Sequence, residues 1–169
     1  MKAIILAAGK GSRLGKLTLD KPKGMLDFMG KTLLEHQIEM YNSIGIKDII
    51  IIRGYKKNKI NFKNIKYIDN DLYNETNMVE SLVCARNYMN DDCIVSYSDI
   101  LFSNNLLKSL VNNDSPIAVT VDSNWKKYWK QRYGSLSKDI EDLQVSNNKI
   151  IRIGQEITGP ETLDYRYVG

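Results

Sequence analysis

Cysteine and histidine are scarce in this sequence of 169 residues. The two cysteines, Cys84 and Cys93, exclude a disulfide framework and a multi-cysteine zinc site. The single histidine, His36, excludes the HExxH zinc motif and any multi-histidine metal cage, and a Ser-His-Asp triad would depend on it entirely. We therefore expect the chemistry of this protein to be carried out by other residue types.

The sequence also lacks a long apolar run and a large excess of either charge. No run approaches the ~18 residues of a membrane-spanning helix, and the apolar stretch after Met1 is too short for a signal peptide. Lys and Arg total 24 against 20 for Asp and Glu, a net charge of +4, and the lysines form no basic stripe of the kind that binds nucleic acid. We expect a soluble, cytoplasmic protein that binds neither membranes nor nucleic acids.

What is present is the composition of a folded domain, with 43% hydrophobic and 26% charged residues. Short apolar runs typical of buried strands alternate with stretches of helical periodicity. The predicted strands are residues 3–6, 48–52, 65–68, 93–97 and 117–121, and the predicted helices are residues 32–44, 77–88 and 104–111. This order predicts the α/β class, with a mixed, mostly parallel sheet flanked by helices and a ligand site at the carboxyl ends of the strands.

The most informative segment follows the first predicted strand. It reads Leu6-Ala7-Ala8-Gly9-Lys10-Gly11-Ser12-Arg13-Leu14-Gly15. Small residues there allow successive backbone N–H groups to approach phosphate oxygens. Two common phosphate motifs each fail by one position. A dinucleotide fingerprint requires glycine where Leu14 stands, and a Walker A loop requires four residues where only three separate Gly11 from Gly15.

The segment continues into Leu17-Thr18 and then Lys21-Pro22-Lys23. Together these motifs resemble the nucleotidyltransferase family that couples nucleoside triphosphates to small phosphorylated molecules, especially the phosphocholine and 2-aminoethylphosphonate cytidylyltransferases. The resemblance implies a Rossmann-like nucleotidyltransferase fold whose C-terminal part is missing from this chain. It also implies one domain over residues 1–169, in which residues 1–110 bind the nucleotide and residues 111–169, apparently truncated, bind the acceptor.

In the implied reaction, an anionic oxygen of the acceptor attacks the α-phosphorus of the triphosphate and pyrophosphate leaves. Because the nucleophile is already charged, positioning and charge neutralisation suffice. Arg13 would stabilise the pyrophosphate, and Lys23 would reach the α-phosphate and the acceptor, so these two are the predicted catalytic residues. Without the loop upstream, Lys23 would be interpreted as an exposed loop lysine.

Two further features of the resemblance concern the metal and the base. The family aspartate that matches Asp99, directly after the strand at residues 93–97, binds Mg²⁺, the implied cofactor, although an aspartate there can also form a turn. Asn77 and Ser81 resemble the Asn-x-x-x-Ser stretch near the base, and the alternative for Asn77 is a helix N-cap. The predicted nucleotide-binding residues are Leu6, Ala7, Ala8, Gly9, Gly11, Ser12, Asn77 and Ser81.

An aromatic and acidic stretch follows the predicted strand at residues 117–121. Trp125 and Trp129 share one helical face with Arg132, which predicts either a helix that docks both tryptophans in the core or an acceptor pocket. In the pocket, aromatic faces and carboxylates would receive a cationic amine and Arg132 a phosphoryl group. The residues assigned to the acceptor pocket are Asp122, Trp125, Trp129, Arg132, Asp139 and Glu141.

The favoured function is therefore Mg²⁺-dependent transfer of a nucleotidyl group, specifically cytidylyl from CTP, to a small phosphorylated or phosphonylated acceptor. A sugar-1-phosphate nucleotidyltransferase is the alternative within the enzyme class. A non-catalytic, nucleotide-binding regulatory subunit is the second alternative, because family members continue past the end of this chain and supply further acidic metal ligands there. The sequence leaves the identity of the acceptor and a homodimeric state open.

Overall fold

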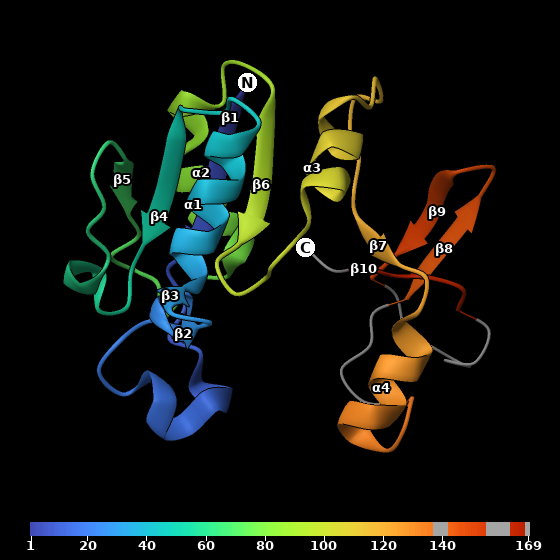
Figure 1. Cartoon of the computed structure of the whole chain (residues 1–169), viewed down its shortest axis with the longest axis horizontal. Coiled ribbons are helices and arrows are strands. Elements are labelled where there is room, and N and C mark those ends of the chain that lie inside the picture. The colour runs from blue at the N-terminus through green and yellow to red at the C-terminus, as the bar shows by residue number, and fades with distance from the viewer. Residues whose placement is uncertain (137–141, 155–162, 168–169) are drawn as a thin grey trace. The chain divides into compact units, whose positions relative to one another are not determined.

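The computed structural model describes residues 1–136, 142–154 and 163–167 (Figure 1). The predicted sites Asp139 and Glu141 lie outside the described residues. The chain forms two compact units, Met1–Lys108 and Ser109–Gly169. That both units act as one domain stays a prediction. Among the described residues, every helix is too short or too polar to cross a membrane.

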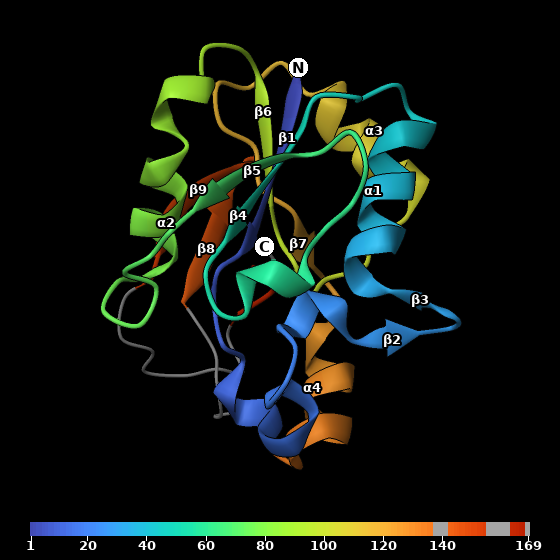
Figure 2. The same ribbon diagram turned by 90° about the vertical axis from the view of Figure 1, so that its left-hand side faces the viewer.

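A four-stranded parallel sheet forms the centre of the first unit. Its strand order is β5 (Lys66–Asp69), β4 (Ile49–Arg53), β1 (Lys2–Ala7) and β6 (Cys93–Tyr97). The two central strands are apolar except for Lys2 at the start of β1 and Arg53 at the end of β4, which suits a sheet whose two faces are covered by helices, as Figure 2 shows for α1 and α2. The predicted α/β class with a parallel sheet is confirmed.

Local signals account for the ends of the helices. The α1 helix (Leu33–Ser43) begins with a capping box between Thr32 and Glu35, and Gly45 follows it with φ +88°, the left-handed conformation that ends many helices. The α2 helix (Met78–Cys84) begins after Asn77. The helix predicted over residues 77–88 is therefore shorter than expected, because a 3₁₀ turn at Arg86–Tyr88 replaces its end. The α3 helix (Asn104–Val111) has the predicted bounds.

The second unit contains α4 (Trp125–Tyr133), the antiparallel hairpin of β8 (Leu143–Ser146) and β9 (Lys149–Ile153), and the antiparallel pair of β7 (Val121–Asp122) and β10 (Arg166–Tyr167). The strand predicted at residues 117–121 is wrong in extent, since only Val121 belongs to β7. Ile117 is 85% and Val119 is 37% exposed, so these two side chains of the run are not taken up by a core, and Pro116 before it cannot donate a backbone hydrogen bond.

Candidate functional site

The carboxyl ends of β1 and β6 bring the predicted catalytic residues to one edge of the sheet. The two strands are parallel neighbours, and the N–H of Ser98 donates to the carbonyl oxygen of Leu6 over 3.1 Å. The glycine loop after β1 and Asp99 after β6 therefore leave the sheet side by side. Lys23 joins them, because its Nζ atom contacts the Oδ2 atom of Asp99. The two side chains are 37% and 28% exposed, so both can reach a ligand.

A 3₁₀ turn at Lys23–Met25 places the lysine. A Cβ atom built on Gly24 would lie 2.9 Å from both Leu34 Cγ and Ser98 Cβ. No side chain fits in that space, so the backbone of the turn packs directly against α1 and the end of β6. Because Gly24 allows this close packing, the neighbouring Lys23 lies next to Asp99.

The glycine loop uses its glycines for different purposes. Gly11 has φ +67°, and the Thr18 hydroxyl donates to its carbonyl oxygen over 3.1 Å, so this glycine serves the loop conformation. Gly9 has no positive φ, and a Cβ atom built on it would meet nothing within 4 Å. The fold does not require glycine at position 9, and the open space in front of its backbone suits a ligand. Ser12 and Arg13 follow at the exposed start of the 3₁₀ segment Ser12–Thr18.

Sequence reasoning assigned no role to Gln37, a polar residue on the buried face of α1. Gln37 is 1% exposed, and its amide nitrogen donates to the carbonyl oxygens of Tyr97 over 2.8 Å and Ile100 over 2.6 Å. Its amide oxygen accepts from Ser96 over 3.2 Å, and Ser96 accepts from the Tyr41 hydroxyl over 2.9 Å. Burial raises the pKa of Tyr41 to about 12, which keeps this hydroxyl a neutral donor. The only sequence signal for this network was glutamine at an apolar position.

The predicted base-contacting residues lie in a second hydrogen-bond network. The Asn77 side chain accepts from the N–H groups of Val79 and Glu80, so the N-cap interpretation is confirmed. Ser81 is 5% exposed and accepts from the Asn70 amide nitrogen over 3.0 Å. Sequence reasoning missed Asn70, which directly follows β5. That Asn77 and Ser81 also contact a base stays a prediction.

The tryptophans of α4 pack inside the second unit. Trp125 is 0% and Trp129 is 5% exposed, and both join Leu163 in one core cluster, which agrees with the prediction of a helix that docks them. The guanidinium carbon of Arg166 lies 3.5 Å from the Trp129 ring centre, and that of Arg132 lies 5.7 Å from it. The carboxylate of Asp122 accepts from the Asn124 N–H over 2.7 Å. An acceptor pocket built from Asp122, Trp125, Trp129 and Arg132 stays a prediction.

The sheet edge carries one carboxylate of the kind that binds magnesium. Among the described residues, no group of three or more His, Cys, Asp or Glu side chains could hold a metal by itself. Asp99 offers one carboxylate that is 28% exposed and whose Oδ2 atom contacts Lys23 Nζ. Mg²⁺ keeps several waters and binds through one or two carboxylates together with substrate phosphates, so this carboxylate suits it.

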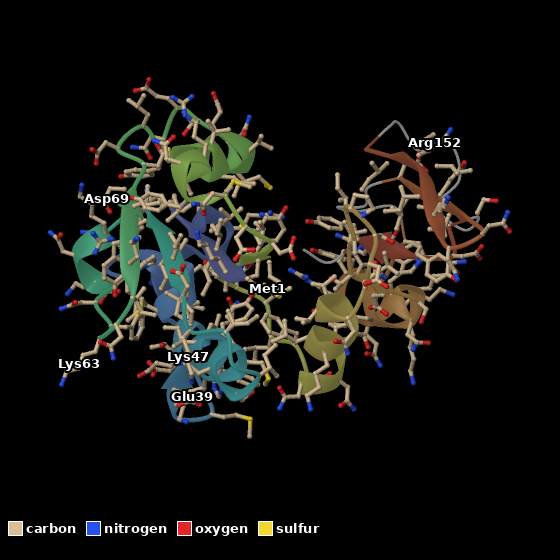
Figure 3. The ribbon with its side chains drawn as sticks, turned by 90° about the horizontal axis from the view of Figure 1, so that it is seen from above. Met1, Glu39, Lys47, Lys63, Asp69 and Arg152 are labelled. Carbon is tan, nitrogen blue, oxygen red and sulfur yellow. The ribbon has the colours of Figure 1, made fainter. Side chains whose placement is uncertain are left out.

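A cavity of about 470 Å³ lies elsewhere in the first unit, at the amino ends of β4 and β5. Ile38 and Ile49 line its apolar part, and Lys47 and Lys63, both labelled in Figure 3, also line it. Because the predicted catalytic residues lie at the carboxyl ends of the strands, this cavity is separate from the candidate site.

Comparison with known proteins gives a consistent picture. The model of the MobA-like NTP transferase domain matches residues 3–149. The CTP:phosphoglutamine cytidylyltransferase of Campylobacter jejuni is 36% identical over all of this chain and 71% of its own length. The solved CTP:phosphocholine cytidylyltransferase of Streptococcus pneumoniae is 39% identical, with a TM-score of 0.58, over 61% of this chain and 47% of that protein. The chain thus spans 47% to 71% of the lengths of these two relatives.

A third comparison concerns the fold alone. The solved inositol-1-phosphate CTP transferase of T. maritima is 22% identical, with a TM-score of 0.73, over 98% of this chain and 67% of that protein. This likeness confirms the predicted nucleotidyltransferase fold.

Proposed function

The chain belongs to the MobA-like NTP transferase domain family, and we propose that it transfers a cytidylyl group from CTP to a small phosphorylated or phosphonylated acceptor. The observation that carries this proposal is the contact between Lys23 and Asp99 at the end of the glycine loop. The ammonium group of Lys23 and the carboxylate of Asp99 then lie next to the glycine loop, whose backbone N–H groups phosphates can approach. Two of the relatives, a CTP:phosphoglutamine and a CTP:phosphocholine cytidylyltransferase, support CTP as the donor.

In the proposed reaction, an oxygen of the acceptor's phosphoryl or phosphonyl group forms a bond to the α-phosphorus of CTP. The bond between that phosphorus and the bridging oxygen of pyrophosphate breaks, and pyrophosphate leaves with the electron pair. The nucleophile is already anionic, so no general base is needed. The rate then depends on how well the protein holds the two anions together and neutralises the charge that moves to pyrophosphate.

Each part of the sheet edge has a role in this proposal. Backbone N–H groups of residues 9–12 would hold the triphosphate, and Arg13 would bind the departing pyrophosphate. Lys23 would contact the α-phosphate and the incoming acceptor. Asp99, together with the phosphates, would hold Mg²⁺, which when bound supplies further positive charge against the phosphate oxygens.

The base and the acceptor would contact other residues. Asn77 and Ser81, with the backbone from Leu6 to Gly9, would surround the cytosine. Asp122 and Arg132 would contact the acceptor, while Trp125 and Trp129, which are 0% and 5% exposed, would form the core that holds α4 in place. These assignments rest on the resemblance to cytidylyltransferases and on the places of these residues in the sequence.

Pyrophosphate release from each of the four nucleoside triphosphates tests the proposal. The assay contains Mg²⁺ and one acceptor at a time from a panel of phosphocholine, phosphoethanolamine, O-phosphoserine, 2-aminoethylphosphonate and glucose-1-phosphate. We expect release with CTP that requires a phosphorylated or phosphonylated amine or amino acid. Release only with glucose-1-phosphate would indicate a sugar-1-phosphate nucleotidyltransferase. Nucleotide binding without release from any of them would indicate a regulatory subunit.

A further inference from the structure

The segment that carries Asp99 is held by one side chain from a distant helix. Gln37 on α1 donates both of its amide hydrogens to β6 and the residues after it, one to the carbonyl oxygen of Tyr97 and one to that of Ile100. These two residues flank Ser98 and Asp99 on either side. A single planar amide therefore fixes both ends of the short segment that presents the carboxylate.

The geometry leaves Gln37 little freedom of its own. The side chain is 1% exposed, and its amide oxygen accepts from the Ser96 hydroxyl, which accepts in turn from Tyr41. Both amide hydrogens and the amide oxygen therefore have partners inside the protein. A fully satisfied buried amide holds a single orientation, because any rotation would leave polar groups without partners in a low-dielectric interior.

Two other contacts limit the same segment. The N–H of Ser98 donates to Leu6 in β1, and Gly24 packs against Ser98 so closely that a Cβ atom would lie 2.9 Å away. Leu6, Gly24 and Gln37 come from three different parts of the chain. Leu6 and Gly24 hold the segment through their backbone atoms, whereas Gln37 holds it through its side chain. A substitution at position 37 can therefore remove these hydrogen bonds and keep the other two contacts.

We infer that Gln37 is a positioning residue for the reaction, because it fixes the direction in which Asp99 presents its carboxylate to the metal–nucleotide complex. This inference rests on the proposed function, since the role of Asp99 as a ligand belongs to that proposal. Groups that orient metal ligands without touching the metal commonly change affinity by about 10–100-fold when they are removed. Gln37 does not touch the phosphates in this account, and it acts only through Asp99.

The chain itself offers a matched control. Ser96→Ala and Tyr41→Phe remove hydrogen bonds on the far side of Gln37, but they leave both of its donated bonds to the segment of Asp99 intact. Gln37→Leu removes both donated bonds. Gln37→Glu keeps the shape of the side chain but has at most one O–H donor, in its protonated form, for the two carbonyl oxygens. All four variants disturb the same buried network, so they separate a loss of stability from a loss of positioning.

The test measures binding rather than turnover. Mn²⁺, a spectroscopic substitute for Mg²⁺, is titrated into protein with CTP and no acceptor, and bound Mn²⁺ is followed by electron paramagnetic resonance. Thermal unfolding of each variant is recorded in parallel. We expect Gln37→Leu and Gln37→Glu to weaken Mn²⁺ binding in the CTP complex by about 10–100-fold. Ser96→Ala and Tyr41→Phe should bind Mn²⁺ as the wild type does, even where their unfolding temperatures fall.

The outcomes separate the inference from the function on which it rests. Wild-type protein that binds no Mn²⁺ with CTP would contradict the proposed function itself. Wild-type binding that is unchanged in the folded Gln37 variants would contradict only the role of Gln37. Equal losses in all four variants, in proportion to their stability, would also overturn it, since Gln37 would then be a core residue like its neighbours. If Gln37→Leu does not fold, Gln37→Glu and the two controls decide the question.

Discussion

The Nζ atom of Lys23 contacts the Oδ2 atom of Asp99, although 76 residues separate the two in sequence. The pair lies where β1 and β6 end, beside a loop whose glycine at position 9 has open space in front of it. Each residue alone would be unremarkable, since a loop lysine and a turn aspartate are common. Their contact at the carboxyl edge of a parallel sheet is what makes them a candidate site.

Replacing Lys23 with alanine should remove turnover without unfolding the protein. A positioned cation at a phosphoryl-transfer site contributes about 10²–10³ in rate, so Lys23→Ala should lose at least that much. The matched control is Lys21→Ala, which removes a lysine of the same loop whose partner, Asp27, is exposed. Steady-state pyrophosphate release and circular dichroism check both variants. Turnover of Lys23→Ala at the rate of Lys21→Ala would contradict the mechanism.

Asp99→Asn should abolish the part of the activity that depends on Mg²⁺ while changing stability little. The carboxylate is 28% exposed, so its loss opens no cavity. A bound cation contributes several kcal/mol of charge stabilisation, which corresponds to about 10²-fold or more in rate. Rates measured over a range of Mg²⁺ concentrations give the result, with Asp92→Asn, at the other end of β6, as the control. Wild-type Mg²⁺ dependence in Asp99→Asn would remove this residue from the site.

Two glycine substitutions should separate folding from binding. In Gly24→Ala the new methyl group would lie 2.9 Å from Leu34 and Ser98, so overpacking should lower the free energy of unfolding by about 1–3 kcal/mol. In Gly9→Ala the methyl group meets nothing within 4 Å, so stability should change by less than about 0.5 kcal/mol. In the proposed site the methyl group would occupy space next to the phosphates, so CTP affinity should fall about tenfold or more, which corresponds to about 1.4 kcal/mol.

Denaturant unfolding and calorimetric titration with CTP measure the two effects of each glycine variant. Unchanged CTP affinity in Gly9→Ala would show that the open space in front of this backbone is not the nucleotide site. Unchanged stability in Gly24→Ala would show that the turn at Lys23 moves freely away from β6.

The acceptor should not be recognised through a cage around Trp129. This ring is 5% exposed, and the guanidinium carbon of Arg166 already lies 3.5 Å from its centre. A quaternary ammonium would meet a cation instead of an open aromatic face. We therefore expect kcat/KM for phosphocholine to be no higher than for phosphoethanolamine, which differs from it only in the three methyl groups. A tenfold preference for phosphocholine that Trp129→Leu abolishes would contradict this expectation.

Much of the first unit could be predicted from the sequence because its signals are local. The short apolar runs of β1, β4 and β6 favour buried strands, and Thr32 with Glu35 has the pattern of a helix start. The motifs around Gly9, Lys23 and Asp99 also identified the residues that the fold brings to one edge, because parallel strands end together. Local pattern and topology agree in this part of the chain.

The remaining features depend on contacts between distant residues. Gln37 falls on the buried face of the predicted helix, but its partners Tyr97 and Ile100 are 60 and 63 residues away, and no pattern in the sequence points to them. Asn70 is a similar case, since its role depends on Ser81. The strand predicted at residues 117–121 is wrong in extent because an apolar run forms a strand only where it pairs with another strand and packs against a core.

Cytidylyl transfer can be followed with CTP that carries radioactive phosphorus at the α position. The protein is incubated with this CTP, Mg²⁺ and the acceptor panel, and the products are separated by chromatography. We expect a labelled CDP-linked product that forms only with a phosphorylated or phosphonylated acceptor, in equal amount to the released pyrophosphate, and that fails to form with Lys23→Ala. A protein that binds CTP but yields no labelled product with any acceptor of the panel would contradict the proposed function.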